Sequence, residues 1–205
     1  TMVFWKKFAL GREDGPEKKD AGRAEGTETA SDMEISRKIE MPQEIERTRE
    51  IITELYVPMK GQVLDVGQSA DEVFASKALG DGVAINPAEG MVCAPCDGTI
   101  SLLFPTKHAV GITSETGVEV LIHIGINTVQ LDGQGFEAFV AQGDKVKKGN
   151  KLIAADLDLI REKGLNPQTM MILPEGGNLD VTVYPGGQAD SGDLAVKAVK
   201  TVKTA

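Results

Sequence analysis

The chain has 205 residues, of which 41% are apolar and only 4% aromatic, as expected for one globular domain with some additional chain. Its longest purely apolar runs span only a few residues, far fewer than the roughly 18 that a membrane-spanning helix requires. The net charge of −9, from 22 basic and 31 acidic residues, has the wrong sign for a nucleic-acid-binding protein, so no nucleic-acid partner is expected. Two cysteines and the lack of a secretory signal pattern favour a cytoplasmic location.

Charged side chains are concentrated at the start of the chain. Residues 1–50 contain 22 of them, whereas the remaining 155 residues contain 31. Between Arg12 and Asp32 there is no Val, Ile, Leu, Met or aromatic residue, so this stretch buries too little apolar surface to offset the entropy of ordering. We therefore expect residues 11–50 to be a charged tether or linker and residues 51–205 to be the folded domain.

Residues 1–10 differ from this tether in being partly apolar. On a helix, Val3, Phe4 and Phe8 would share one side with two lysines at its flank, a pattern suited to an anionic membrane surface. A disordered chain end explains the same residues, because so short a helix is marginal in water. Contact with a membrane surface through residues 2–10, at the inner face of the membrane, is therefore one of two open expectations.

Short β-rich runs, separated by Gly, Pro, Asn and Asp, make up most of the chain after about residue 57. The expected strands lie at 63–66, 83–85, 99–104, 118–126, 136–141, 151–155 and 181–184. Short strands at such regular spacing are typical of a sandwich or a barrel. The sequence predicts an all-β fold, an antiparallel β-sandwich or jelly-roll-like barrel with one or two short helices.

Two helices are expected around these strands. Residues 43–56 carry isoleucines among charged residues, and Pro58 would end a helix there. Residues 157–163 form the second, opened by Asp156 or Asp158 and closed by a glycine at position 164.

The most informative strand is 118–126. Because alternate residues of a strand face opposite sides, one apolar face is formed by Val118, Val120, Ile122, Ile124 and Ile126. His123 then faces away from the core, beside Gly125, whose missing side chain leaves room for a reactant to approach. A half-exposed strand histidine without a role explains the same pattern.

The chain contains one other histidine, His108, and the turn at 114–117 suits a hairpin that would bring the two rings together. Two facing imidazoles suggest metal binding, general acid/base catalysis, or phosphoryl transfer through a phosphohistidine. In the last case a neutral imidazole attacks phosphorus, and donors such as the second histidine and Thr106 meet the charge on the transferred oxygens. With an ordinary pKa of about 6.5, histidine is largely neutral near pH 7.

Residues 117–131 resemble the phosphorylation-site signature of the glucose-type enzyme IIA (EIIA type-1) domains of the bacterial phosphoenolpyruvate-dependent sugar phosphotransferase system. Further segments resemble this family in the same order, at 57–63, 71–75, 80–87, 94–100, 106–108, 135–136 and 143–152. The resemblance extends over about residues 52–202. The charged head resembles, loosely, the membrane-tethering segment of some free-standing members, and a linker from a larger IICBA permease chain would look the same.

The resemblance implies a β-sandwich phosphotransferase with no bound cofactor. His123 would accept a phosphoryl group from HPr and donate it to a cysteine on the IIB domain of a glucose-family permease, for sugar uptake. By the same resemblance His108 would stabilise the phosphoryl group, Thr106 would orient His108, and the backbone of Gly125 would orient His123.

The family also presents a docking rim around the site. The matching residues here are Asp71, Val73, Phe74, Phe104, Leu121 and Asn127. Leu121 stands where some members have an aromatic residue and Asn127 where some have aspartate. Regulatory proteins are also expected as partners, and these two differences from other members leave their identity open.

Two other classes of protein remain as alternatives. Cys93 and Cys96 form a C-x-x-C that suggests a zinc or redox site, although two strand-end thiols explain it as well. His108 and His123 alone are too few for an intrinsic metal site, but a partner could complete an interfacial zinc site. A biotinyl or lipoyl carrier domain would need an exposed lysine at a symmetric turn, and only Met59-Lys60 offers one.

Overall fold

The computed structural model describes residues 47–174 and 179–204, which form antiparallel sheets with short helical turns. The strands are β1 (Arg47–Tyr56), β2 (Gly61–Asp65), β3 (Asp81–Pro87), β4 (Met91–Cys93), β5 (Gly98–Leu103), β6 (Ala109–Ser114), β7 (Glu119–His123), β8 (Phe136–Ala138), β9 (Lys145–Val146), β10 (Lys151–Ala155), β11 (Thr169–Leu173), β12 (Leu179–Val183), β13 (Gly187–Ala189) and β14 (Leu194–Thr204). The helical segments are η1 (Val66–Gln68), α2 (Glu72–Ala75), η2 (Thr128–Leu131) and α3 (Leu157–Glu162). The prediction of an all-β fold with one or two short helices is confirmed, and the expectations for residues 1–46 lie outside the described residues.

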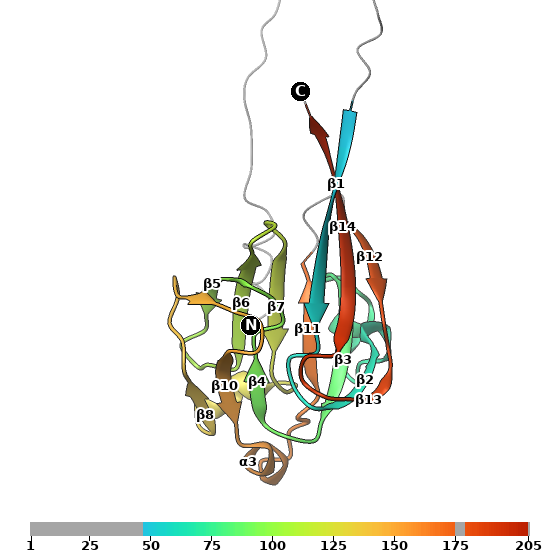
Figure 1. Ribbon diagram of the computed structural model, residues 1–205. Helices are drawn as coiled ribbons and strands as arrows, with labels where there is room; N and C mark the ends of the chain where they lie inside the picture. The colour runs from blue at the N-terminus through green and yellow to red at the C-terminus, as the bar shows by residue number, and fades with distance from the viewer. Residues whose placement is uncertain (1–46, 175–178, 205) are drawn as a thin grey trace, which may run out of the picture. The chain divides into compact units, whose positions relative to one another are not determined.

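Three sheets surround one core (Figure 1). The largest has the order β13-β2-β3-β11-β7-β6-β5-β9, and the other two have the orders β1-β14-β12 and β4-β10-β8. All pairings recorded between these strands are antiparallel. The described sheets do not close into a barrel, so the sandwich form of the prediction is the one observed.

The core follows the alternation expected for the histidine strand. Val118, Val120, Ile122 and Ile124 are all at most 2% exposed and belong to the main apolar cluster, whereas Ile126 is half-buried. The strand itself ends at His123, three residues earlier than expected, because Gly125 has a positive φ of 73° that leaves extended geometry. His123 therefore occupies the last position of a rigid strand, where the chain turns away.

Residues 47–56 form a strand, and the helix expected at 43–56 is wrong for this part. Thr53 and Leu55 are buried while Glu54 is exposed, which is a period of two and not of a helical turn. The long strand β14 lies beside β1 in the sheet, so tertiary pairing overrides the local helical pattern. Strand β1 begins at Arg47, a few residues before the expected start of the domain.

Helix α3 is the predicted helix at 157–163. The carboxylate of Asp156 accepts hydrogen bonds from the backbone N–H groups of Asp158 and Leu159, which identifies Asp156 as the N-cap. Gly164, with φ of 71°, follows the helix as expected. The strand expected at 136–141 is shorter than predicted, ending at Ala138.

Candidate functional site

The β6–β7 hairpin brings the two histidines together, as the turn at 114–117 predicted. In its register Ala109 lies opposite His123, so His108 lies one position beyond the last pair. The two ring centroids are 5.0 Å apart, and the ring planes are inclined by 83°. Strand β11 fixes the other side of β7, with Met170 opposite His123. The central strands of the largest sheet thus hold both imidazoles.

His108 is a buried ring with fixed orientation. It is 4% exposed, and its Nδ1 lies 2.6 Å from the hydroxyl oxygen of Thr106. The Phe104 ring packs against it edge-on at 5.2 Å, and the carbonyl of His108 accepts a hydrogen bond from the backbone of Ile124. The intervening Lys107 adopts a left-handed conformation, with φ of 55°, which turns the chain so that Thr106 reaches back to the ring.

His123 is half-buried, and its Nδ1 has almost no exposed surface. The ring is hydrogen-bonded to the backbone of Gly125 and packs against the Phe74 ring at a centroid distance of 5.3 Å. A side chain at Gly125 would clash with the Cγ2 methyl of Thr128, whose hydroxyl donates to the carbonyl of Ile124 at 2.5 Å. Because Nδ1 is enclosed, Nε2 is the nitrogen of this ring that another molecule can approach.

Burial lowers the pKa of both histidines. Desolvation lowers the pKa of His108 to about 4. The pKa of His123 is lowered to about 3, mainly by desolvation and then by the charge of His108, while the hydrogen bond to Gly125 acts in the opposite direction. Both rings are therefore neutral near pH 7, and a neutral imidazole has a lone pair available for attack.

Residues 53–178 match the family described as phosphoenolpyruvate-dependent sugar phosphotransferase system, EIIA 1. The chain belongs to this EIIA family. The glucose-specific EIIA component of Bacillus cereus is 49% identical over 119 residues, which are 58% of this chain and 72% of that protein. The solved glucose permease IIA of Mycoplasma capricolum is 39% identical, with a TM-score of 0.66, covering 72% of this chain and 96% of the other.

Longer proteins also contain this domain. The glucoside-specific EIICBA component of Staphylococcus carnosus is 40% identical over 150 residues, which are 71% of this chain. The chain spans only 22% of that protein and 23% of the glucose-specific EIICBA component of Staphylococcus saprophyticus. EIIA domains thus occur alone and fused, and in both settings they are phosphotransferase components that carry phosphate between proteins.

The expected docking residues of the EIIA domain lie in the elements around the two rings. Val73 is 37% exposed and Phe104 half-buried, whereas Phe74 and Leu121 are at most 6% exposed. The last two lie beneath the surface around the site, where the Phe74 ring packs against the His123 ring and Leu121 lies in β7 between β6 and β11. The exposed apolar surface next to the histidines therefore comes from α2 and from the 104–108 turn.

The two polar rim residues have different surroundings. Asp71 is the N-cap of α2, and its carboxylate accepts hydrogen bonds from the backbone of Val73 and Phe74. Asn127 is exposed, has a left-handed φ of 61° and makes no side-chain cap. The two N–H groups hold the Asp71 carboxylate at the first turn of α2, so its place beside the EIIA docking face is set by the helix that it caps.

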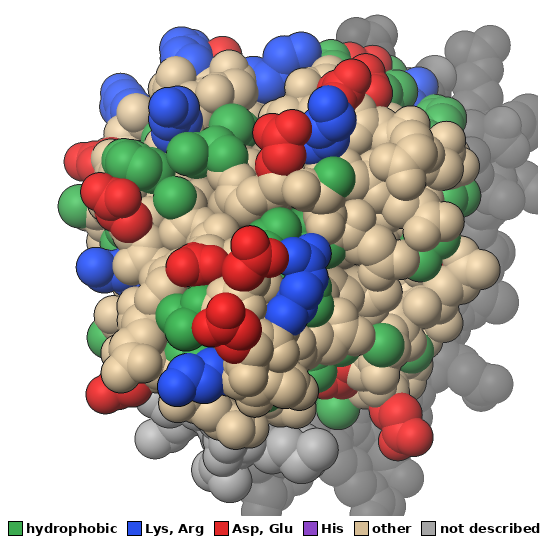
Figure 2. Space-filling view, turned by 90° about the horizontal axis from the view of Figure 1, so that it is seen from below, with side chains coloured by type: hydrophobic (Ala, Val, Ile, Leu, Met, Phe, Trp, Pro, Cys, Tyr) green, Lys and Arg blue, Asp and Glu red, His purple; other side chains and the backbone are tan. Residues whose placement is uncertain are grey.

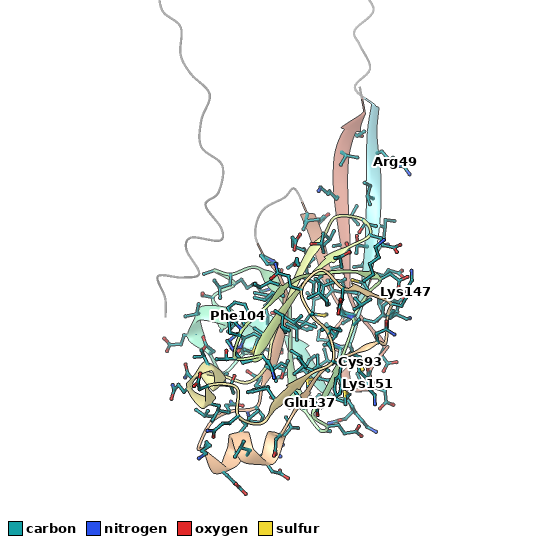
Figure 3. All side chains as sticks on the ribbon, turned by 90° about the vertical axis from the view of Figure 1, so that its left-hand side faces the viewer. Arg49, Cys93, Phe104, Glu137, Lys147 and Lys151 are labelled. Carbon is teal, nitrogen blue, oxygen red and sulfur yellow. The ribbon has the colours of Figure 1, made fainter. Side chains whose placement is uncertain are left out.

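The cysteines lie away from the histidines. In Figure 3, Phe104 marks the histidine side of the EIIA domain, and Cys93, Lys147 and Lys151 lie on the opposite side. Both thiols are free, and Cys96 is buried, which raises the pKa of its thiol to about 11. A thiol with this pKa is protonated near pH 7, which argues against Cys96 as a reactive thiol.

No three His, Cys, Asp or Glu side chains are grouped as metal ligands among the residues that the structure describes. A zinc ion on His108 and His123 would therefore take its remaining ligands from a partner. Lys60, the candidate for a biotinyl or lipoyl attachment, is engaged in ion pairs with Glu89 and Asp190. Membership of the EIIA family favours neither the zinc site nor the biotinyl or lipoyl attachment.

Other surfaces of the EIIA domain carry mixed charge. Figure 2 shows the end of the domain at which α3 lies, where acidic, basic and hydrophobic side chains alternate and no histidine is visible. Arg161 there forms an ion pair with Asp158. Within the described ranges, no helix combines the length and apolar character needed to cross a membrane.

Proposed function

We propose that His123 is the phosphoryl acceptor of this EIIA domain, taking the group from HPr and passing it to a cysteine on the IIB domain of a glucose-family permease. The observation that carries this proposal is the enclosure of Nδ1 of His123 against the Gly125 backbone, beside the buried ring of His108. We assign Nδ1–H of His123 as the donor to the Gly125 backbone, which leaves the lone pair on Nε2. One nitrogen is thereby selected as the nucleophile.

The first transfer exchanges one N–P bond for another. Nε2 of His123 attacks the phosphorus of the phosphohistidine on HPr, a new N–P bond forms, and the bond to the HPr nitrogen breaks. In the second transfer a cysteine thiolate of IIB attacks the same phosphorus and Nε2 leaves with its electron pair. No metal or organic cofactor takes part in these steps.

His108 stabilises the charge on the transferred oxygens. When the Thr106 hydroxyl donates to Nδ1 of His108 across their 2.6 Å contact, the ring proton resides on Nε2 and points toward the phosphoryl group. This donor is fixed by the Phe104 ring before the phosphoryl group arrives, so no reorganisation is needed during transfer. Thr106 therefore acts through His108 as a positioning residue.

The surroundings of the histidines suit a partner with an apolar contact surface and basic side chains. Val73 and Phe104 offer apolar contact, and the net charge of −9 attracts a basic protein at long range. We assign the same surface to HPr and IIB in turn, because each must reach Nε2 of His123. Regulatory proteins that bind the unphosphorylated form would compete for it.

Residues 11–46, the part of the expected tether that precedes β1, are proposed to connect this cytoplasmic domain to another component, or to the membrane surface through residues 2–10. The occurrence of EIIA domains in both free and EIICBA proteins supports a connecting role. Cosedimentation of the full chain with anionic vesicles, compared with a variant lacking residues 1–10, tests the membrane part. Equal sedimentation of both would leave only the linker role.

Intact-mass analysis tests the proposal on the full chain incubated with phosphoenolpyruvate, enzyme I and HPr. The wild type is expected to gain one acid-labile phosphate, and His123→Gln none. His108→Gln is expected to gain the phosphate and to transfer it poorly to IIB. Phosphate gained by His123→Gln, or none gained by the wild type, would refute the assignment.

A further inference from the structure

Gln168 is a buried amide at the point where β11 begins. Its side chain is 5% exposed, and two residues later Met170 pairs with His123. The backbone N–H of Gln168 is held by the side chain of Asn166, whose backbone pairs with Ile126 in the loop after His123. The residues that lead into β11 therefore lie against the histidine loop on one side.

On its other side the amide holds the segment that leads to α2. The side-chain oxygen of Gln168 accepts hydrogen bonds from the backbone N–H of Ala70 at 2.8 Å and from the hydroxyl of Ser69 at 3.0 Å. Its side-chain nitrogen donates to Asn86 on β3 at 2.9 Å. All three contacts join segments more than 80 residues apart in the sequence, so the amide is a tertiary link and not a local turn.

The tethered segment carries the aromatic side chain that covers His123. Asp71 follows Ala70 and caps α2, and Phe74 of this helix packs its ring on the His123 ring. Helix α2 has only four residues and cannot hold its own position, because isolated helices of this length are unstable. Its place on the sheet depends on tertiary contacts, and Gln168 makes two of them with the residues just before the cap, Ser69 and Ala70.

We propose that Gln168 is a positioning residue that holds α2, and with it Phe74 and Val73, against the phosphoryl acceptor. The kinetic part of this inference rests on the proposed function of His123. Without the amide oxygen, Ser69 and Ala70 lose their common acceptor and α2 gains freedom to leave the sheet. Gln168 contacts neither imidazole, so the loss acts on docking at α2 more than on the chemical step.

The test compares Gln168→Leu with the wild type by two measurements. In NMR spectra, the ring protons of His123 are expected to move toward the positions they take in Phe74→Leu, because the ring current of Phe74 is lost. In transfer from phosphorylated HPr, KM is expected to rise about tenfold while kcat changes less than about twofold.

Three further variants separate positioning from general loss of stability. Gln168→Glu keeps an acceptor oxygen for Ser69 and Ala70 and is expected to restore the His123 signals. Asn86→Ala removes the third contact of Gln168, together with the hydrogen bond from Asn86 to Gln62, and leaves the contacts with Ser69 and Ala70 in place. Ile153→Val weakens the core at β10, which belongs to a different sheet from the histidine strand. Both are expected to leave the His123 signals and KM at wild-type values.

The proposal is overturned if folded Gln168→Leu retains the wild-type His123 signals and KM, or if Ile153→Val changes them equally. If Gln168→Leu does not fold, Ser69→Ala, which removes one of the two contacts, must shift the same signals in the same direction. A wild type that accepts no phosphate would refute the function of His123. The NMR comparison would still decide whether Gln168 positions α2.

Discussion

The rings of His108 and His123 meet edge to face, with their centroids 5.0 Å apart, although the residues are 15 positions apart in the sequence. One ring is oriented by a hydroxyl and the other by a backbone group. In the proposed function, these different partners select different tautomers of the two rings, and therefore different roles as hydrogen-bond donor and nucleophile.

Thr106→Val is expected to slow phosphoryl transfer to IIB by about tenfold to a hundredfold, because His108 loses the contact that fixes its tautomer. Thr106→Ser, which keeps the hydroxyl, should lose much less. Single-turnover transfer measures the rates, and 15N spectra of His108 report the tautomer. An unchanged tautomer in Thr106→Val would contradict the orienting role.

Gly125→Ala is expected to destabilise the domain by more than the roughly 1–2 kcal/mol of a left-handed alanine, because its Cβ would also clash with Thr128. Gly117→Ala is the matched control. Gly117 has a similar φ of 79° but no atom near its missing side chain, so only the backbone cost applies. Urea unfolding measures both, and phosphate incorporation should fall in Gly125→Ala alone. Equal losses in the two variants would refute the steric part of the argument.

The stability of the domain should decrease as the pH is lowered from 6.5 toward 4. The unfolded histidines bind protons below about pH 6.5, whereas the folded rings, with pKa values of about 4 and 3, do not. Stability is therefore full above pH 6.5, and each histidine contributes a loss of up to about 1.4 kcal/mol per pH unit below it. Urea titrations at pH 5, 6 and 7 measure the slope, which should be roughly halved in His108→Gln. A slope that is the same in this variant would show that other groups cause it.

Cys96 should resist thiol reagents in the folded domain. With a pKa of about 11, only roughly one molecule in a thousand carries the thiolate at pH 8, and the side chain is also buried. Alkylation followed by peptide mass analysis should modify Cys93 first and Cys96 only after unfolding. Rapid modification of Cys96, or a disulfide between the two, would reopen the redox interpretation.

Asp71→Ala is expected to lower the free energy of unfolding by about 1 kcal/mol, because the cap of α2 is lost.

Asn127→Asp is expected to leave stability nearly unchanged and to speed association with HPr at low salt, since Asn127 is exposed and uncapped. Stopped-flow measurements of the rate of association with HPr at two salt concentrations test the effect of Asn127→Asp. Identical rates for Asn127→Asp and the wild type at low salt would place Asn127 outside the docking surface.

The sequence by itself determined the strand that carries His123 and the hairpin that brings His108 to it. Alternation of Val118, Val120, Ile122 and Ile124 is a local pattern, and burial of one strand face follows directly from it. The start of the helix at 157–163 was likewise recognisable, with Asp156 or Asp158 as its cap, because capping depends on residues only two or three positions apart. These features need no knowledge of distant segments.

Tertiary structure decided the rest. Residues 47–56 became a strand because β14, about 140 positions later, lies beside it. Phe74 and Leu121 were expected in the docking rim and are buried, Phe74 against the His123 ring and Leu121 on a strand with a neighbour on each side. Gln168 had no sequence signal at all, since its three partners come from Ser69, Ala70 and Asn86. Long-range contacts of this kind are fixed only when the whole chain folds, because no short window of sequence contains both partners.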